Sequence, residues 1–254
     1  MKLGAQFYTL REQCQTLEGL SESLKKVADI GYTTVQLSGV CTYEPEWMKE
    51  ELKKNGLECV LTHWRADEIL ADPVSVINKH KTFGCQNIGL GCMPGGWATE
   101  EMTHNFIKDF KEPAKIIAAN GAKLFFHNHH CEFMRCADGE LIFDKIIKAF
   151  EPNELNFTLD TYWVQMGGGN PCEWLEKLSG RVECIHLKDL EMVGMEQRMA
   201  PIGQGNLNFP KIIEAAEKAG TKYALVEQDN CYGRDPFECL KQSYEYLKSL
   251  GLNK

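Results

Sequence analysis

Carboxylate and imidazole side chains recur at the ends of four short apolar segments of this chain. The polar residues follow one another as HNHHCE (127–132), LD (159–160), HLKD (186–189) and EQD (227–229). A buried parallel strand is normally apolar along its length, so a charged or imidazole group at its end needs a partner. Carboxylates brought together repel one another, whereas a divalent cation with carboxylate and imidazole ligands stabilises the same group. If the four segments converge, these residue types predict a metal site.

The predicted ligands of one divalent cation are Asp160, His186 and Glu227, with a fourth ligand from the HNHHCEF segment. Either Glu132 or His127 could supply it. We favour Glu132, because three carboxylates and one histidine would slightly over-neutralise the ion and leave it able to retain a water or a substrate oxygen. Mixed nitrogen and oxygen ligands suit Mn²⁺, Zn²⁺, Co²⁺ or Fe²⁺ better than Mg²⁺. Asp160 could instead cap a helix, and Glu227 could instead pair with a lysine.

Further polar and aromatic side chains near strand ends have the composition of a sugar-binding pocket. Aromatic faces pack against the C–H faces of sugar rings. Lys188 lies two residues after His186, so it faces the same side and could bind a substrate oxygen, unless it is a surface lysine paired with Asp189. The loop 203–206 could offer backbone N–H groups to an anion or form a simple turn. The predicted substrate contacts are His63, His129, Trp163, Lys188, Tyr8 and Arg11.

Eight apolar or β-branched runs alternate with longer segments of helical periodicity, which is typical of a parallel sheet built from βα units. Helical segments such as 17–31 and 209–220 end in glycine, and glycine after a helix takes the left-handed conformation that closes it. The pattern predicts a single domain over 1–254, a (β/α)₈ TIM barrel whose strand ends converge at one mouth. The predicted strands are Leu3–Tyr8, Thr34–Ser38, Cys59–His63, Asn87–Cys92, Lys123–His129, Asn156–Asp160, Glu183–Lys188 and Ala224–Glu227.

Composition excludes several classes of protein. No apolar stretch approaches the roughly 20 residues of a membrane span, and the N-terminus lacks the features of a signal peptide, so we expect a cytoplasmic protein without a membrane partner. The 11 cysteines include no CxxC pair and are expected to be reduced. A net charge of −8 argues against a nucleic-acid partner. The sequence is compatible with a homo-oligomer.

Five segments together resemble the sugar phosphate isomerase/epimerase family of xylose isomerase-like barrels, which includes inosose dehydratases, ketose 3-epimerases and endonuclease IV. The resemblance covers essentially the whole chain, and the segments follow one another in the order and spacing that the family uses. They are FHNHHCEF (126–133), LDTYWVQMGGGNP (159–171), RVECIHLKDL (181–190), PIGQGNLNFPKII (201–213) and LVEQDN (225–230).

The resemblance implies a metal-dependent enzyme of carbohydrate metabolism, with the metal held by Glu132 or His127, then Asp160, His186 and Glu227. Two departures stand out. The ketose 3-epimerases carry a metal-binding, proton-moving glutamate on the fifth strand, where this chain has His127. Gln204 stands where many relatives have glutamate.

The predicted reaction begins with proton abstraction from a carbon next to a carbonyl or hydroxyl-bearing carbon of a keto-sugar or polyol, and the metal stabilises an enediolate-like intermediate. The candidate catalytic residues are Glu227, His127 and Lys188. We expect an isomerase or epimerase first. A dehydratase (lyase) of a keto-sugar or inosose is the alternative, and a sugar-binding barrel without catalysis is the second alternative. An endonuclease IV-like activity would need more histidines and a basic groove.

Overall fold

Runs of apolar and β-branched residues form eight parallel strands, which close into a barrel with the order β1-β10-β7-β6-β5-β4-β3-β2. The computed structural model describes residues 1–252. All eight predicted strands are confirmed, with ends that differ from the prediction by a few residues. Their bounds are β1 Lys2–Gln6, β2 Thr34–Leu37, β3 Glu58–His63, β4 Asn87–Leu90, β5 Lys123–His127, β6 Leu155–Asp160, β7 Cys184–Leu187 and β10 Tyr223–Val226.

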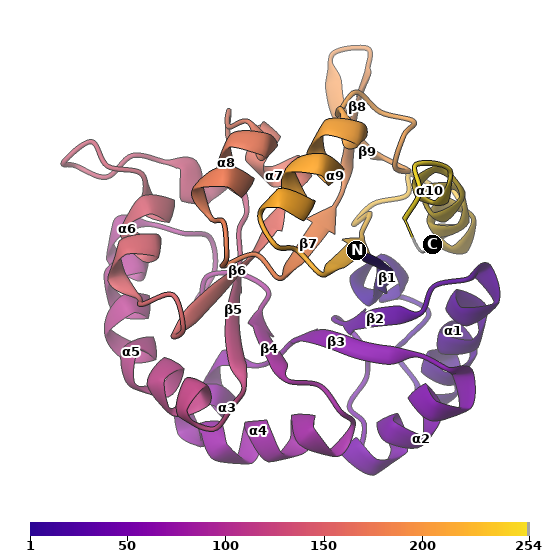
Figure 1. Cartoon of the computed structure of the whole chain (residues 1–254), viewed down its shortest axis with the longest axis horizontal. Helices are drawn as coiled ribbons and strands as arrows, with labels where there is room; N and C mark the ends of the chain where they lie inside the picture. The colour runs from indigo at the N-terminus through magenta and orange to yellow at the C-terminus, as the bar shows by residue number, and fades with distance from the viewer. Residues whose placement is uncertain (253–254) are drawn as a thin grey trace.

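Helices surround the barrel and cover the outer face of the strands (Figure 1). Gly31 and Gly220, which follow α1 and α9, have φ values of 119° and 87°, so the predicted left-handed glycines at these two helix ends are confirmed. The helices are α1 Leu17–Ile30, α2 Pro45–Asn55, α3 Ala66–Ala71, α4 Pro73–Thr82, α5 Glu100–Ala119, α6 Ile142–Ala149, α7 Thr161–Met166, α8 Pro171–Lys177, α9 Phe209–Lys218 and α10 Pro236–Ser249. Two short 3₁₀ helices, η1 (Phe7–Leu10) and η2 (His130–Phe133), follow β1 and β5 closely.

The inside of the barrel is filled by buried apolar side chains from alternate strands. Leu61, Phe125, Cys184 and Leu225 belong to one such cluster and are fully buried. Side chains two residues apart on a strand point to the same face. The next layer toward the carboxyl ends of the strands is therefore formed by the residues two positions after the members of this cluster. On β5, on β7 and just past β10, this layer holds polar side chains.

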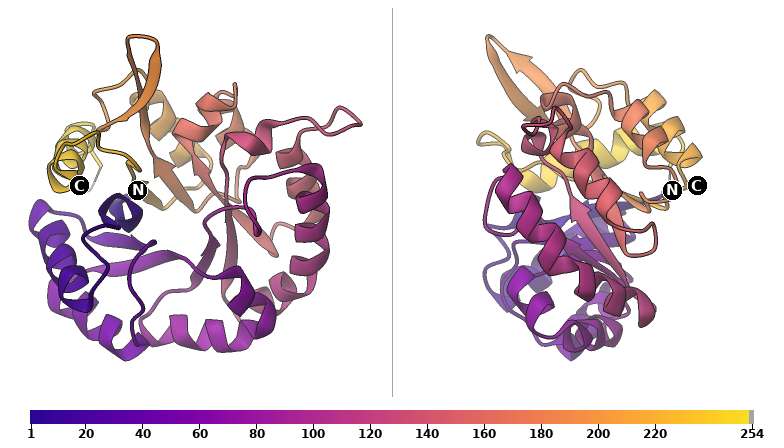
Figure 2. Two further views of the ribbon diagram at one scale, coloured as in Figure 1. Left: turned by 180° about the vertical axis from the view of Figure 1, so that it is seen from behind. Right: turned by 90° about the vertical axis from the view of Figure 1, so that its left-hand side faces the viewer.

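A β-hairpin that the sequence did not predict interrupts the βα pattern after β7. Strands β8 (Asp189–Val193) and β9 (Glu196–Ala200) pair antiparallel, and the hairpin projects away from the barrel (Figures 1 and 2). The tip of the hairpin is exposed to solvent. Its two strands therefore lack the continuous apolar run from which the barrel strands were predicted. Among residues 1–252, no helix combines the length and the apolar character needed to cross a membrane.

Candidate metal centre

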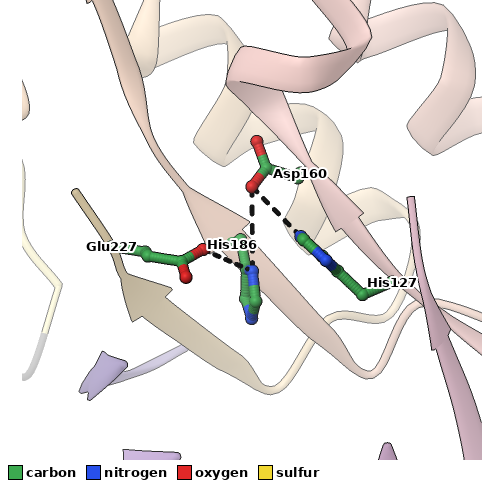
Figure 3. A group of neighbouring side chains, drawn as sticks. All are labelled: His127, Asp160, His186 and Glu227. Atoms are coloured by element: carbon green, nitrogen blue, oxygen red, sulfur yellow. Dashed lines mark hydrogen bonds and ion pairs between the residues drawn. The ribbon is translucent and has the colours of Figure 1, made fainter. Parts of the chain in front are cut away.

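Four strand ends bring His127, Asp160, His186 and Glu227 together inside the mouth of the barrel (Figure 3). One ligand atom from each of these side chains lies within 4.8 Å of the others, and all four residues are buried. Asp160 is paired directly with His186 in the register of β6 and β7. The layered packing of the barrel interior therefore places these side chains at one level, where they face one another.

Hydrogen bonds to the two histidines fix which nitrogen faces the group. His127 Nδ1 lies 3.0 Å from the Gly91 carbonyl oxygen, so it carries the proton and donates it, while Nε2 lies 3.2 Å from Asp160 Oδ2. His186 Nε2 lies 2.6 Å from Gln36 Oε1 and donates to it, while Nδ1 lies 2.9 Å from Glu227 Oε2. Each imidazole thus presents one nitrogen to the centre, as metal-binding histidines do when their other nitrogen is held by an oxygen.

The two carboxylates divide their oxygens between structural contacts and the centre. Asp160 Oδ1 accepts from the Trp163 backbone N–H and caps α7, while Oδ2 faces the histidines. Glu227 Oε1 accepts from Gln6 Nε2 at 2.6 Å, while Oε2 faces His186. The helix cap that the sequence offered as an alternative for Asp160 is therefore present together with the cluster, and not in place of it.

Lys188 is the cation nearest this group. Its Nζ lies 2.9 Å from both Asp160 Oδ2 and Glu227 Oε2, and 3.0 Å from Asp229 Oδ1. The structure therefore gives Lys188 buried partners, and the alternative of a surface pair with Asp189 is wrong. The alternative role predicted for Glu227 was an ion pair with a lysine. This ion pair is present, and it occurs together with the cluster of four residues.

Electrostatic interactions set the protonation of the group. Burial alone would raise the pKa of Asp160 and Glu227, but Lys188 and the histidines outweigh it and hold both pKa values well below their usual range. Burial alone would lower the pKa of His186, but Glu227 and Asp160 raise it above its ordinary value. Burial and the neighbouring His186 lower the pKa of His127, so its imidazole is neutral at neutral pH. Two ionised carboxylates therefore face imidazole nitrogens in a buried site.

This donor set fits a divalent cation. His186 Nδ1 and Glu227 Oε2 are buried and 2.9 Å apart, yet neither has a well-aligned hydrogen-bond partner among residues 1–252. Carboxylate oxygens and imidazole nitrogens that converge in a buried site are stabilised by a shared cation. Two imidazoles and two carboxylates suit Mn²⁺, Zn²⁺, Co²⁺ or Fe²⁺ better than Mg²⁺.

Glu132, which we favoured as the fourth ligand, lies outside the group, and His127 takes the place beside Asp160. The chain leaves β5 at His127 and turns into η2, where Glu132 Oε2 accepts from the His129 backbone N–H at 2.7 Å and from the Cys131 thiol. Burial raises the pKa of Glu132 to about 7. Glu132 thus stabilises the turn that follows the strand.

A cavity of about 500 Å³ opens above the four side chains, within the size range of small-molecule sites. The structure brings all the predicted substrate contacts to its wall. His129 reaches the cavity even though β5 ends two residues before it. The predicted residues that line the cavity are Tyr8, Arg11, His63, His129, Trp163 and Lys188, together with His127 and Glu227.

Several residues of the site were missed by sequence reasoning. Asp229 lines the cavity two residues after Glu227, and the same period-two argument that was applied to Lys188 would have found it. Trp97 also lines the cavity, is 62% exposed, and lies with its ring centroid 5.4 Å from that of His129. Gln6 and Gln36 have no local signal, because their roles depend on contacts with distant strands.

The loop 203–206 does offer its backbone N–H groups to an anion, and that anion is a carboxylate of the same chain. Gly203 and Gly205 N–H both donate to Asp189 Oδ2 at 2.9 Å, and Leu207 N–H donates to Asp189 Oδ1. Asp189 is fully buried at the start of the hairpin. This contact ties the loop to the first residue of β8, which directly follows Lys188 and the end of β7.

Comparison with known proteins gives a family match and distant relatives. The family model described as "Xylose isomerase-like TIM barrel" matches residues 24–250. Inosose dehydratase from Geobacillus kaustophilus (strain HTA426) is 25% identical, with 89% of this chain and 86% of that protein covered. The solved structure of a sugar phosphate isomerase/epimerase from Parabacteroides distasonis ATCC 8503 has a TM-score of 0.84 at 23% identity, covering 100% of this chain and 95% of that one. An L-ribulose 3-epimerase structure has a TM-score of 0.75 at 12% identity, covering 98% and 94%. The two structural likenesses show the fold.

Proposed function

The chain belongs to the xylose isomerase-like TIM barrel family, and from this membership and the geometry of the site we propose that it is a divalent-metal-dependent enzyme acting on a keto-sugar or on a cyclic polyol that carries a carbonyl group. The proposal rests on one observation, the convergence of His127, Asp160, His186 and Glu227 beneath a cavity lined by polar and aromatic side chains. The reaction begins with removal of a proton from a carbon next to a carbonyl group.

His127, Asp160, His186 and Glu227 would hold the metal ion. When bound, the ion supplies positive charge that stabilises the enediolate-like anion formed by proton removal. The family relationship and the donor set support this assignment together.

The cavity offers two candidates for the base. Glu227 has its Oε1 held by Gln6, but its lowered pKa makes it a weak base. His63 is the other candidate: Ser38 Oγ lies 2.9 Å from its Nδ1, and its Nε2 is buried without a hydrogen-bond partner among the described residues. Burial and the neighbouring His127 lower the pKa of His63, so its imidazole is neutral and can accept a proton, but it too is a weak base.

The remaining wall of the cavity binds and orients the substrate. Trp163 lies stacked on His130, with ring centroids 5.1 Å apart, and its Nε1 is buried without a hydrogen-bond partner in the part of the chain that the structure describes. Lys188 Nζ lies 5.3 Å from the centroid of the Trp163 ring. We infer that Trp163 packs against the C–H face of a sugar ring and that Lys188 donates to a substrate oxygen.

Proton abstraction leads either to isomerisation or epimerisation, where the proton returns to carbon, or to dehydration, where a neighbouring hydroxyl is lost. The sequence favoured the first outcome. His127 favours the second, because it replaces the fifth-strand carboxylate that would serve as a second proton-moving group. The 25% identical relative is named as an inosose dehydratase, which agrees with this second candidate.

Deuterium exchange tests the proposal directly. A panel of keto-sugars and inososes is incubated in D₂O with the protein and Mn²⁺, and then with a chelator added. We expect solvent deuterium to enter at least one substrate, and the chelator and Glu227→Gln each to abolish the exchange. Glu214→Gln, which removes the same charge from an exposed residue paired with Lys218, should leave it unchanged. Loss of water from the substrate identifies a dehydratase, and substrate binding with neither deuterium exchange nor loss of water would refute catalysis.

A further inference from the structure

The ammonium group of Lys188 is buried among the carboxylates of the candidate metal centre. Its side chain is 1% exposed, and its Nζ lies within 3.0 Å of three carboxylates: Asp160 and Glu227, both in the centre, and Asp229, outside it. A buried ammonium group is tolerated only where acceptors compensate for the water it loses. Lys188 therefore neutralises carboxylates of the site with the chain's own positive charge.

The oxygens that contact Lys188 are the same atoms that face the histidines. Asp160 Oδ2 lies 2.9 Å from Lys188 Nζ and 3.2 Å from His127 Nε2. Glu227 Oε2 lies 2.9 Å from Lys188 Nζ and 2.9 Å from His186 Nδ1. A divalent cation held by these oxygens would repel an ammonium group at the same atoms, since like charges in a buried site are poorly screened. The cation and the lysine thus depend on one pair of oxygens.

Asp229 gives the lysine a partner that the metal centre does not use. Asp229 is not one of the four converging residues, yet its Oδ1 and Oδ2 lie 3.0 Å and 3.1 Å from Lys188 Nζ. It also lines the cavity, so an ammonium group held by Asp229 stays on the substrate side of the centre.

We propose that Lys188 and the divalent cation compete for Asp160 Oδ2 and Glu227 Oε2, and that Asp229 retains the ammonium group when the cation takes these oxygens. This inference rests on the proposed function in one respect, namely that a divalent cation binds the four side chains. Its consequence is that Lys188 lowers the affinity of the site for metal and that Asp229 partly restores it.

Titration of the chelator-treated full chain with Mn²⁺, followed by calorimetry, tests the competition. Lys188→Met should lower the Kd for Mn²⁺ about tenfold or more, because the competing charge is removed from two ligand oxygens. Lys111→Met is the matched control, since it removes the same charge but from a lysine paired with Glu154, which precedes β6 at the end opposite Asp160. It should change the Kd by only about twofold, as expected for a charge acting at a distance. An unchanged or higher Kd in Lys188→Met, or an equal gain in Lys111→Met, overturns the competition.

A double-mutant cycle tests the role of Asp229. Asp229→Asn should raise the Kd for Mn²⁺ about threefold or more in the wild-type background, but have little effect when Lys188 is already methionine. An equal effect in both backgrounds would mean that Asp229 acts through its own charge, which contradicts a role in retaining Lys188.

The outcomes separate this inference from the proposed function. If neither the wild-type protein nor Lys188→Met binds Mn²⁺, the metal centre itself is refuted. If the wild-type protein binds Mn²⁺ and Lys188→Met binds it no more tightly, only the competition fails. Should Lys188→Met not fold, Lys188→Gln keeps a hydrogen-bond donor without the charge. The rise in Tm on adding Mn²⁺ should then be larger for Lys188→Gln than for the wild type, and an equal or smaller rise overturns the proposal.

Discussion

Gln36→Met tests whether a contact from the far side of the barrel orients a metal ligand. Gln36 is fully buried on β2, and its Oε1 accepts from His186 Nε2 at 2.6 Å. Methionine has a similar length but offers no strong acceptor, so it leaves the Nε2–H group buried without a partner. The imidazole then loses the contact that directs Nδ1 toward Glu227 and Asp160.

The expected magnitude follows from this single contact. Loss of the partner that orients a metal-binding histidine lowers metal affinity about 10- to 100-fold, or about 1.4 to 2.7 kcal/mol. The unpaired N–H group lowers the free energy of unfolding by about 1 to 3 kcal/mol. For a chain of this size, the second effect corresponds to a fall in Tm of about 2 to 12 °C.

Calorimetric titration with Mn²⁺ and thermal unfolding followed by circular dichroism measure the two effects. Ser38→Ala is the matched control, because Ser38 Oγ lies 2.9 Å from Nδ1 of His63, a histidine outside the group of four. It should leave the affinity for Mn²⁺ unchanged. If Gln36→Met binds Mn²⁺ as tightly as the wild type, the orientation of His186 does not depend on Gln36 and the reasoning is refuted.

Three further substitutions probe the cavity wall, the loop and the turn after β5. Trp97→Ala removes an exposed aromatic face and should raise KM about tenfold with little change in kcat. A tenfold fall in kcat would instead place Trp97 in the chemical step. Asp189→Asn weakens the charge-assisted hydrogen bonds from Gly203 and Gly205. Urea denaturation should therefore show a loss of about 2 to 4 kcal/mol in the free energy of unfolding. An unchanged urea midpoint would refute a stabilising role for these hydrogen bonds. Burial raises the pKa of Glu132 to about 7, so the folded state favours the protonated form. That stabilisation is present below the unfolded pKa of about 4.5 and is lost as the pH rises through about 7. Glu132→Gln should therefore flatten the dependence of the urea midpoint on pH over this range, and equal slopes in both proteins would contradict the assignment.

The barrel could be predicted because its signals are local. Apolar runs mark each strand, and glycines such as Gly31 and Gly56 close helices through their own backbone conformation. The end of β5 was harder to place, because the segment after His127 continues with residues that would also fit a strand. The Asn128 side chain instead accepts from the Asp160 backbone N–H, and the chain turns into η2. The hairpin after β7 carries no comparable apolar run.

The part of the candidate site that lies where the strand ends converge could be predicted from the sequence. Asp160, His186 and Glu227 follow from that rule, because the carboxyl ends of parallel strands meet at one mouth. The choice between Glu132 and His127 depends on the hydrogen bond from the His129 N–H, which residue spacing does not reveal. The partners of the ligands, such as Gln36, come from strands far away in the sequence, so only the folded chain brings them into contact.

An imidazole on the fifth strand in place of a carboxylate influences both the charge of the centre and the reactions open to it. Two carboxylates and two neutral imidazoles balance a divalent cation, whereas a third carboxylate would leave an excess negative charge that weakens the stabilisation of an anionic intermediate. Epimerisation with a carboxylate on each face of the substrate needs an acidic group opposite Glu227. Glu132 is held by the His129 N–H, and Asp229 follows Glu227 beyond the same strand. Among the described residues that line the cavity, the carboxylates are Glu227 and Asp229, and His63, His127 and His129 are imidazoles whose pKa values burial lowers. The lining therefore lacks the second, opposed carboxylate that a two-carboxylate epimerisation would use.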